Sequence, residues 1–176
     1  QGEPSRLSIS TFKDRTKAFL KIQDGCENFC SYCKVPYVRG PFSSKPLDAI
    51  IHEVQALVAD GFKEIVLTGI CLGAWGKGKG EAGNEEYGGE DPSVVHVLRA
   101  IDGIPGDFRV RLSSIEHRYV TDELIDYMAH GRRMCRHLHI PLQSGDDGIL
   151  RAMNRPYACE DFQRTVDRAR SRIPGL

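Results

Sequence analysis

Four short apolar stretches with strand character alternate with helical stretches, and this order limits the fold more than any other feature of the chain. The strand-like stretches are apolar and mostly closed by turn residues, and they cover 18–23, 64–69, 108–114 and 137–142. Apolar residues at helical spacing follow them, over 47–58, 94–101, 124–128, 149–153 and 162–169. Strands that alternate with helices form a parallel sheet with the helices packed outside, and right-handed crossovers curl it toward a barrel. The sequence therefore predicts an α/β fold, a partial (βα) barrel with four βα units.

The segments between these elements carry weaker signals. Thr121 is expected to cap the helix over 124–128, since a threonine hydroxyl accepts a backbone hydrogen bond at a helix start. The stretch 73–90 contains seven glycines and little apolar content, which predicts a long loop. Trp75 in this stretch is expected to pack on the barrel.

The ends of the chain suggest a part of a longer protein. Residues 1–16 show no apolar period and no initial Met, and we interpret them as a linker from a missing N-terminal domain. Residues 17–176 are expected to form one core domain that is truncated before the last strands of a barrel. We therefore expect an apolar edge and inner face of the sheet to be exposed.

The charge balance gives no long-range attraction to a polyanion. The chain has 24 Lys and Arg against 24 Asp and Glu, so its formal net charge is zero. No apolar run approaches the ~20 residues of a membrane span, and the N-terminus lacks the apolar core of a signal peptide. We expect a cytoplasmic protein without membrane contact. Any contact with a polyanion would need a local basic patch or a separate module.

Three of the six cysteines are clustered: Cys26, Cys30 and Cys33 lie within eight residues, directly after the first predicted strand. Three thiols cannot all pair in internal disulfides, and a structural zinc normally takes four ligands. Three thiolates with one open position suit a 4Fe-4S cluster. A zinc-binding or electron-carrier module stays open as the alternative. The other cysteines, Cys71, Cys135 and Cys159, are separated and are expected to be free thiols.

The cysteine spacing, with Tyr32 just before the third cysteine, resembles that of the radical S-adenosylmethionine (radical SAM) superfamily. This resemblance implies a partial barrel of the radical SAM type. It also implies that the open iron of the 4Fe-4S cluster chelates S-adenosylmethionine. One electron from the cluster then cleaves the sulfonium and makes a 5′-deoxyadenosyl radical, and an electron donor is an implied partner.

Within that superfamily the chain is most similar to the methylthiotransferases. The similarity is carried by residues 21–26, 36–40, 67–70, 111–116 and 137–145. It implies addition of a methylthio group to threonylcarbamoyladenosine beside the anticodon of tRNA, with isopentenyl-type adenosine or a ribosomal protein as alternative substrates. It also implies a second 4Fe-4S cluster in a missing N-terminal domain and a missing C-terminal module that binds tRNA. Without these parts, the chain alone is not expected to complete turnover.

Two positions depart from the pattern of these enzymes. His117 stands where proline is usual, and Lys45 stands where arginine is usual. The lysine keeps the charge but loses a planar, bidentate donor.

The motifs that carry the resemblance follow predicted strands, so they are expected at one rim, because the carboxyl ends of barrel strands form the active face. The residues expected to bind S-adenosylmethionine are Tyr32, Thr68, Gly69, Ser113, Ser114, Glu116 and Gln143. Arg39 is expected to bind a phosphate or carboxylate of the substrate, with an ordinary surface ion pair as the alternative.

Overall fold

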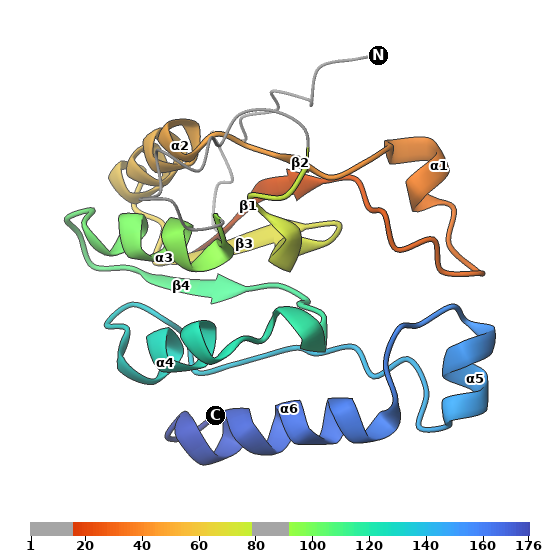
Figure 1. Cartoon of the computed structure of the whole chain (residues 1–176). Coiled ribbons are helices and arrows are strands. Elements are labelled where there is room, and N and C mark those ends of the chain that lie inside the picture. Colours follow the sequence, from red (N-terminus) through yellow and green to blue (C-terminus); the bar gives the residue numbers. More distant parts are fainter. Residues whose placement is uncertain (1–15, 79–91) are drawn as a thin grey trace.

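The computed structural model describes residues 16–78 and 92–176, and these form the predicted α/β fold. Three parallel strands lie side by side in the order β1 (Lys17–Asp24), β3 (Glu64–Gly69) and β4 (Arg109–Leu112), and a two-residue strand, β2 (Ser43–Ser44), pairs antiparallel with β1. Figure 1 shows helices packed along the outside of this curled sheet. The partial barrel is confirmed, although β2 was not predicted.

The helices begin and end close to the expected residues: α2 (Leu47–Ala59), α3 (Val94–Asp102), α4 (Asp122–His130), α5 (Asp147–Ala152) and α6 (Cys159–Arg172). Thr121 caps α4 as predicted, because its hydroxyl accepts a hydrogen bond from the Leu124 N–H at 3.2 Å. Three short helical turns were not predicted, namely α1 (Val35–Arg39), η1 (Leu72–Ala74) and η3 (His117–Tyr119).

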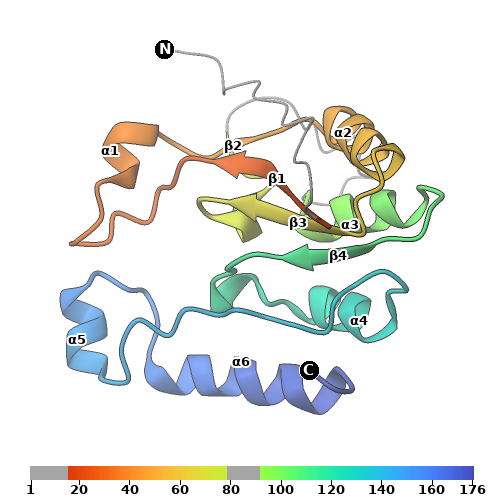
Figure 2. The same ribbon diagram turned by 180° about the vertical axis from the view of Figure 1, so that it is seen from behind.

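The fourth predicted strand, 137–142, is not a regular strand. The chain there runs extended beside β4, and it pairs with that side of the sheet only at the isolated bridges Val110–Met134 and Ser114–His139. Pro141 has no N–H to donate, and among the described residues only one neighbouring strand is present to pair with. The segment still occupies the place of a fourth strand, as Figure 2 shows from behind.

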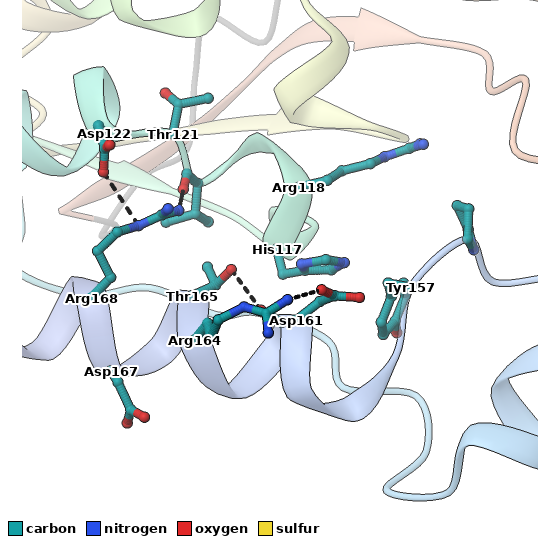
Figure 3. Close-up of a pocket in the computed structure, with 12 residues that line it drawn as sticks. His117, Arg118, Thr121, Asp122, Tyr157, Asp161, Arg164, Thr165, Asp167 and Arg168 are labelled. Atoms are coloured by element: carbon teal, nitrogen blue, oxygen red, sulfur yellow. Dashed lines mark hydrogen bonds and ion pairs between the residues drawn. The ribbon is translucent and has the colours of Figure 1, made fainter.

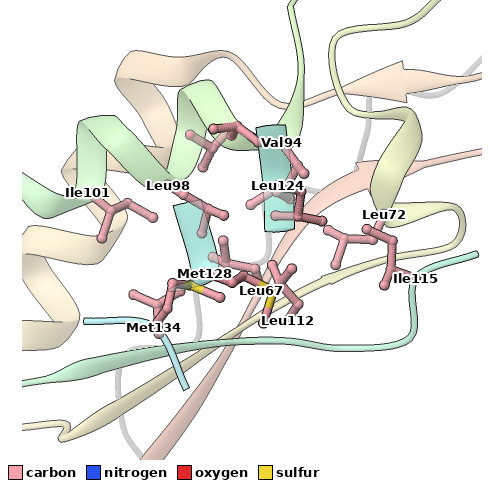
Figure 4. Packing of buried hydrophobic residues seen from close by; sticks show 14 of the residues in the cluster. Leu67, Leu72, Val94, Leu98, Ile101, Leu112, Ile115, Leu124, Met128 and Met134 are labelled. Carbon is pink, nitrogen blue, oxygen red and sulfur yellow. The ribbon is translucent and has the colours of Figure 1, made fainter. Parts of the chain in front are cut away.

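The hydrophobic core lies between the sheet and the outer helices. Leu67 and Leu112 point from neighbouring strands toward Leu98 of α3 and Leu124 of α4, and all four are at most 1% exposed. Figure 4 shows these side chains packed together. Burial of such side chains stabilises the sheet by about 1.5–3 kcal/mol each, which explains why periodic apolar residues predicted the elements well.

The inner face of the sheet is charged, and the prediction of an apolar inner face is wrong. Side chains that alternate with the core residues belong to Lys17, Lys21, Glu64, Arg109 and Arg111. Exposed apolar side chains are few on this face, Phe19 being the large one at 58%. Residues of the strands alternate between the two faces of the sheet, as the sequence indicated. Those on the face opposite the core are mostly charged rather than apolar.

The glycine-rich stretch is more ordered at its start than predicted. Residues 72–75 are buried in the core, and Trp75 is 1% exposed with its Nε1 donating to the Lys45 carbonyl at 3.0 Å. The packing predicted for Trp75 is confirmed. The remainder of the predicted loop, 79–90, lies outside the described residues. Within the described ranges, no helix combines the length and apolarity needed to cross a bilayer.

Candidate metal centre

The cysteine loop connects β1 to α1, and a tight turn at Gly25 begins it. Gly25 has φ +71°, and a Cβ there would lie 1.8 Å from the Pro41 carbonyl oxygen, so only glycine fits. The loop then closes on itself, because the Cys26 N–H donates to the Gly40 carbonyl at 3.1 Å and the Cys33 N–H donates to the Cys30 carbonyl at 3.0 Å. The sequence thus presents three thiols from one short, folded loop.

The three thiols of the loop lie near one another. Burial raises the pKa of the Cys26 thiol, and Glu116, Cys30 and Cys33 are near enough to raise it further. Among the described residues, no three His, Cys, Asp or Glu side chains converge on a point that would hold one ion. Thiolates that each bind a different iron of a cluster need not converge in this way. Loading requires these thiols to lose their protons.

Gln23 is a buried residue of the site that the sequence analysis missed. Its side chain is 2% exposed, and its Nε2 donates to the carbonyls of Asp24 and Gly25. Its Oε1 accepts from the Cys71 N–H at 2.7 Å. One amide therefore ties the start of the cysteine loop to the end of β3. A polar residue among the apolar residues of a predicted strand was the signal in the sequence that could have indicated this buried amide.

Glu116 is the centre of a polar cluster beside the loop. Its Oε1 accepts from Asn28 Nδ2 at 3.0 Å and from Arg155 Nη1 at 2.8 Å, while its Oε2 pairs with Arg118 Nε at 3.1 Å. Arg118 also donates to Asn28. The carboxylate predicted to bind cofactor is thus engaged with the cysteine loop through Asn28.

Tyr32 and Gln143, both predicted to bind cofactor, are in contact. The Tyr32 hydroxyl donates to Gln143 Oε1 at 3.1 Å and accepts a hydrogen bond from Arg155 Nη2. Gln143 has φ +67°, which is unusual for a residue with a side chain. Arg155, which no motif indicated, donates to both Tyr32 and Glu116 and so joins two of the predicted residues.

The remaining predicted residues end β3 and β4 at the same rim. Thr68 and Gly69 are half-buried, and a Cβ on Gly69 would lie 3.0 Å from the Gln23 side chain, so the chain is tightly packed there. Ser113 donates its N–H to the Leu67 carbonyl at 3.0 Å. The Ser114 hydroxyl pairs with His139 Nδ1 at 2.8 Å. These four residues are brought together by the parallel register of the sheet.

Arg39 forms an ion pair within the chain. Its Nη1 lies 3.7 Å from Asp24 Oδ2, and its side chain is 55% exposed. Asp24 also pairs with Lys21 and accepts a hydrogen bond from the Gly25 N–H. The ion pair that was the alternative for Arg39 is present at the start of the loop.

The isolated cysteines are free thiols, as predicted. Cys71 packs against Cys26 and Ala74, and burial raises the pKa of its thiol to about 11. It is therefore protonated near neutral pH.

An open groove of about 880 Å³ lies between η3 and α6 (Figure 3). His117 lies in it against the Tyr157 ring, with ring centroids 4.3 Å apart. Arg164 and Arg168 line its other part, and both are paired with acidic residues. None of the predicted cofactor residues lines this groove, so it is not the predicted cofactor site.

Comparison with known proteins identifies the kind of domain. The model of the radical SAM superfamily matches residues 20–176. The chain is 42% identical over 165 residues to the threonylcarbamoyladenosine tRNA methylthiotransferase MtaB of Thermotoga maritima, covering 93% of this chain and 36% of that protein. It is 39% identical over 159 residues to the tRNA-2-methylthio-N(6)-dimethylallyladenosine synthase of Carboxydothermus hydrogenoformans, covering 90% and 34%. The chain thus spans about a third of the length of these relatives.

Solved structures agree with the fold. The chain resembles the radical S-adenosylmethionine methyltransferase TsrM of Kitasatospora setae with a TM-score of 0.63 at 18% identity, covering 89% of this chain and 28% of TsrM. It also resembles the cobalamin-dependent S-adenosylmethionine radical enzyme OxsB with a TM-score of 0.62 at 11% identity, covering 84% and 21%. At such identities the likeness concerns the fold alone.

Proposed function

This chain belongs to the radical SAM superfamily, and from that membership we propose that it is the core of a tRNA methylthiotransferase that holds a 4Fe-4S cluster through Cys26, Cys30 and Cys33. Membership implies a 4Fe-4S cluster and S-adenosylmethionine as cofactors. The observation that carries the proposal is the placement of the three thiols in one loop at the rim where β1, β3 and β4 end. That rim is where βα barrels place their chemistry.

The bound cluster and S-adenosylmethionine together supply a carbon radical that can activate an unreactive C–H bond. The protein's own residues hold and orient these groups. In our proposal Thr68, Gly69, Ser113 and Ser114 line the cofactor at the strand ends, where close backbone approach and hydroxyl donors are available.

Three further residues act from the loop side of the same cofactor. Glu116 is held in place by Asn28 and Arg155, and Tyr32 is held by Gln143 and Arg155. Such fixed side chains orient a ligand at little entropic cost when it binds. We keep Arg39 as a substrate-binding candidate, which requires it to exchange its pairing with Asp24 for a phosphate of RNA.

We propose threonylcarbamoyladenosine beside the anticodon as the nucleoside, in the cytoplasm, with an electron donor protein as partner. The support is a 42% identity to an enzyme named for that nucleoside. A second candidate is dimethylallyladenosine, because an enzyme named for it is 39% identical. The difference between these identities is small, so the nucleoside has to be measured.

Reconstitution with iron and sulfide tests the metal centre. We expect about four irons per set of three cysteines and an EPR signal of the reduced protein that changes when S-adenosylmethionine is added. Cys30→Ser should lose this cluster, because it removes one of the three thiols. Cys159→Ser, on α6, is the matched control and should keep it. Zinc binding, or an iron cluster whose EPR signal ignores S-adenosylmethionine, would favour the electron-carrier or zinc alternative.

The nucleoside is tested in cells from which the gene that encodes this chain has been deleted. Nucleosides from total tRNA of these cells are analysed by mass spectrometry. Loss of the methylthio form of threonylcarbamoyladenosine alone supports the first candidate. Loss of the methylthio form of dimethylallyladenosine alone identifies the second.

A further inference from the structure

Arg155 connects the cysteine loop to the end of β4, although it lies 122 positions beyond Cys33 in the sequence (155 − 33). Its side chain is 9% exposed. Nη1 donates to Glu116 Oε1 at 2.8 Å, Nη2 donates to the Tyr32 hydroxyl, and the guanidinium carbon lies 5.7 Å from the centre of the Tyr32 ring. A single planar group therefore holds both neighbours.

The backbone around Arg155 grips the same loop. The Ser31 N–H donates to the Met153 carbonyl at 3.1 Å, and the Ser31 hydroxyl donates to the Ala152 carbonyl at 2.9 Å. Asn154 Nδ2 donates to the Phe29 carbonyl at 2.9 Å. The end of α5 and the residues that follow it thus hold the cysteine loop on both sides of Cys30.

Backbone strain concentrates at this junction. Among the described residues, the non-glycine residues with positive φ are Phe29 at 46°, Gln143 at 67° and Asn154 at 56°. One belongs to the cysteine loop, one contacts Tyr32, and one precedes Arg155. Each such conformation is strained and persists only where the surroundings enforce it.

The hydrogen bonding of Arg155 is incomplete. Its Nε is buried and has no acceptor among the described residues. A buried donor without a partner destabilises the folded chain. The guanidinium is also close enough to Cys30 to interact with its thiol electrostatically. A positive group with a free donor thus lies beside one of the thiols of the centre.

We propose that Arg155 is the positioning residue of the cluster, fixing the cysteine loop through Tyr32 and Glu116 and offsetting the negative charge of the bound thiolates. This inference rests on the proposed function, since it presumes a cluster on Cys26, Cys30 and Cys33. Two consequences follow. The loop is preformed before metal binds, and the positive charge stabilises the reduced cluster, which raises its reduction potential.

Two substitutions separate the geometry from the charge. Arg155→Lys keeps the positive charge but cannot hold Glu116 and Tyr32 with one planar fork. Arg155→Gln removes the charge and keeps a polar side chain. Arg151→Gln is the matched control, because it makes the same charge change at an exposed position of the neighbouring helix α5.

The loop is measured first in the metal-free chain by hydrogen exchange of residues 26–33. We expect exchange on the order of tenfold faster in both Arg155 variants, since hydrogen bonds to a charged group are lost. Thermal melting shows whether each variant is folded. Exchange equal to that of the native chain in both folded variants would overturn the positioning role.

The potential is measured on the reconstituted chain by an EPR-monitored redox titration. We expect a more negative midpoint potential for Arg155→Gln, a value near the native one for Arg155→Lys, and no shift for Arg151→Gln. A folded, iron-loaded Arg155→Gln with the native potential would refute the charge role. Absence of a cluster from the native chain would count against the proposed function instead, while the exchange experiment would still decide the positioning of the loop.

Discussion

Glu64 at the start of β3 accepts a hydrogen bond from Arg111 Nε of the neighbouring strand β4 at 2.8 Å, and its side chain is 2% exposed. Arg109 and Lys17 pair with the same carboxylate at 2.6 and 3.2 Å. This group lies at the opposite end of the strands from the cysteine loop. It joins β1, β3 and β4 on the charged inner face, so it stabilises the sheet without taking part in the site.

The pH dependence of stability is expected to reflect Glu64. The hydrogen bond from Arg111, together with Lys17 and Arg109, lowers the pKa of Glu64 from 4.5 to about 2. A lowered pKa gives stability that is present above the unfolded value and is lost as the pH falls through the folded value. We expect Glu64→Gln to lower the free energy of unfolding by about 2 kcal/mol at pH 7, allowing for the exposure of Lys17 and Arg109. The difference from the native chain should shrink between pH 4.5 and 2, measured by urea unfolding.

Glu160→Gln is the control for this prediction. Glu160 is 80% exposed and pairs with Arg164 on the surface of α6. Its substitution should change stability by less than about 1 kcal/mol. Equal losses for the two variants would contradict a special role of Glu64.

Gly73→Ala is expected to destabilise the turn at η1. A Cβ at Gly73 would lie 2.2 Å from Tyr119 Cβ, and Gly73 is buried. Overpacking of this kind costs about 1–3 kcal/mol. The expected result is a lower midpoint of thermal unfolding. Gly145→Ala is the control, because nothing lies within 4 Å of the added Cβ.

Gln23→Leu is expected to loosen the junction between the cysteine loop and β3. The substitution leaves the Cys71 N–H and the Gly25 carbonyl without their side-chain partner in a buried place. We expect a loss of about 1–3 kcal/mol in the free energy of unfolding, with lower iron content after reconstitution. Native iron content in a Leu variant would show that the loop forms without this amide.

Tyr32→Phe tests the hydroxyl that joins Gln143 to Arg155. The ring is 52% exposed, so the thermal midpoint should hardly change. We expect S-adenosylmethionine to bind the reconstituted protein several-fold more weakly, measured by titration of the EPR change, because the residues around it are less fixed. Tyr37→Phe is the control, since Tyr37 is 77% exposed on α1. Equal affinities for both variants would show that the hydroxyl plays no part in binding.

The sequence by itself determined the helices, three of the strands, the family and the spacing of the three clustered cysteines. The spacing of apolar residues and capping residues such as Thr121 predicted the helices. Both signals are local, because the spacing within one segment decides which face of a helix is buried. The prediction of a regular strand over 137–142 was wrong. Strand pairing depends on the neighbouring strands and on the missing N–H of Pro141, and the spacing of apolar residues reports neither. The spacing of Cys26, Cys30 and Cys33 is local, so it was visible in the chain.

Only the tertiary structure decided which partners hold the site. Arg155 lies outside the quoted motifs, and Gln23 and Asn28 lie within them without a role that the sequence revealed. All three act through contacts with residues far away in the sequence. The inner sheet face is likewise charged because Arg109 and Arg111 lie beside Glu64 on a neighbouring strand. Local propensity reports which residues are buried, whereas ion pairs and hydrogen bonds between distant segments depend on register and crossover, which are fixed only when the whole chain folds.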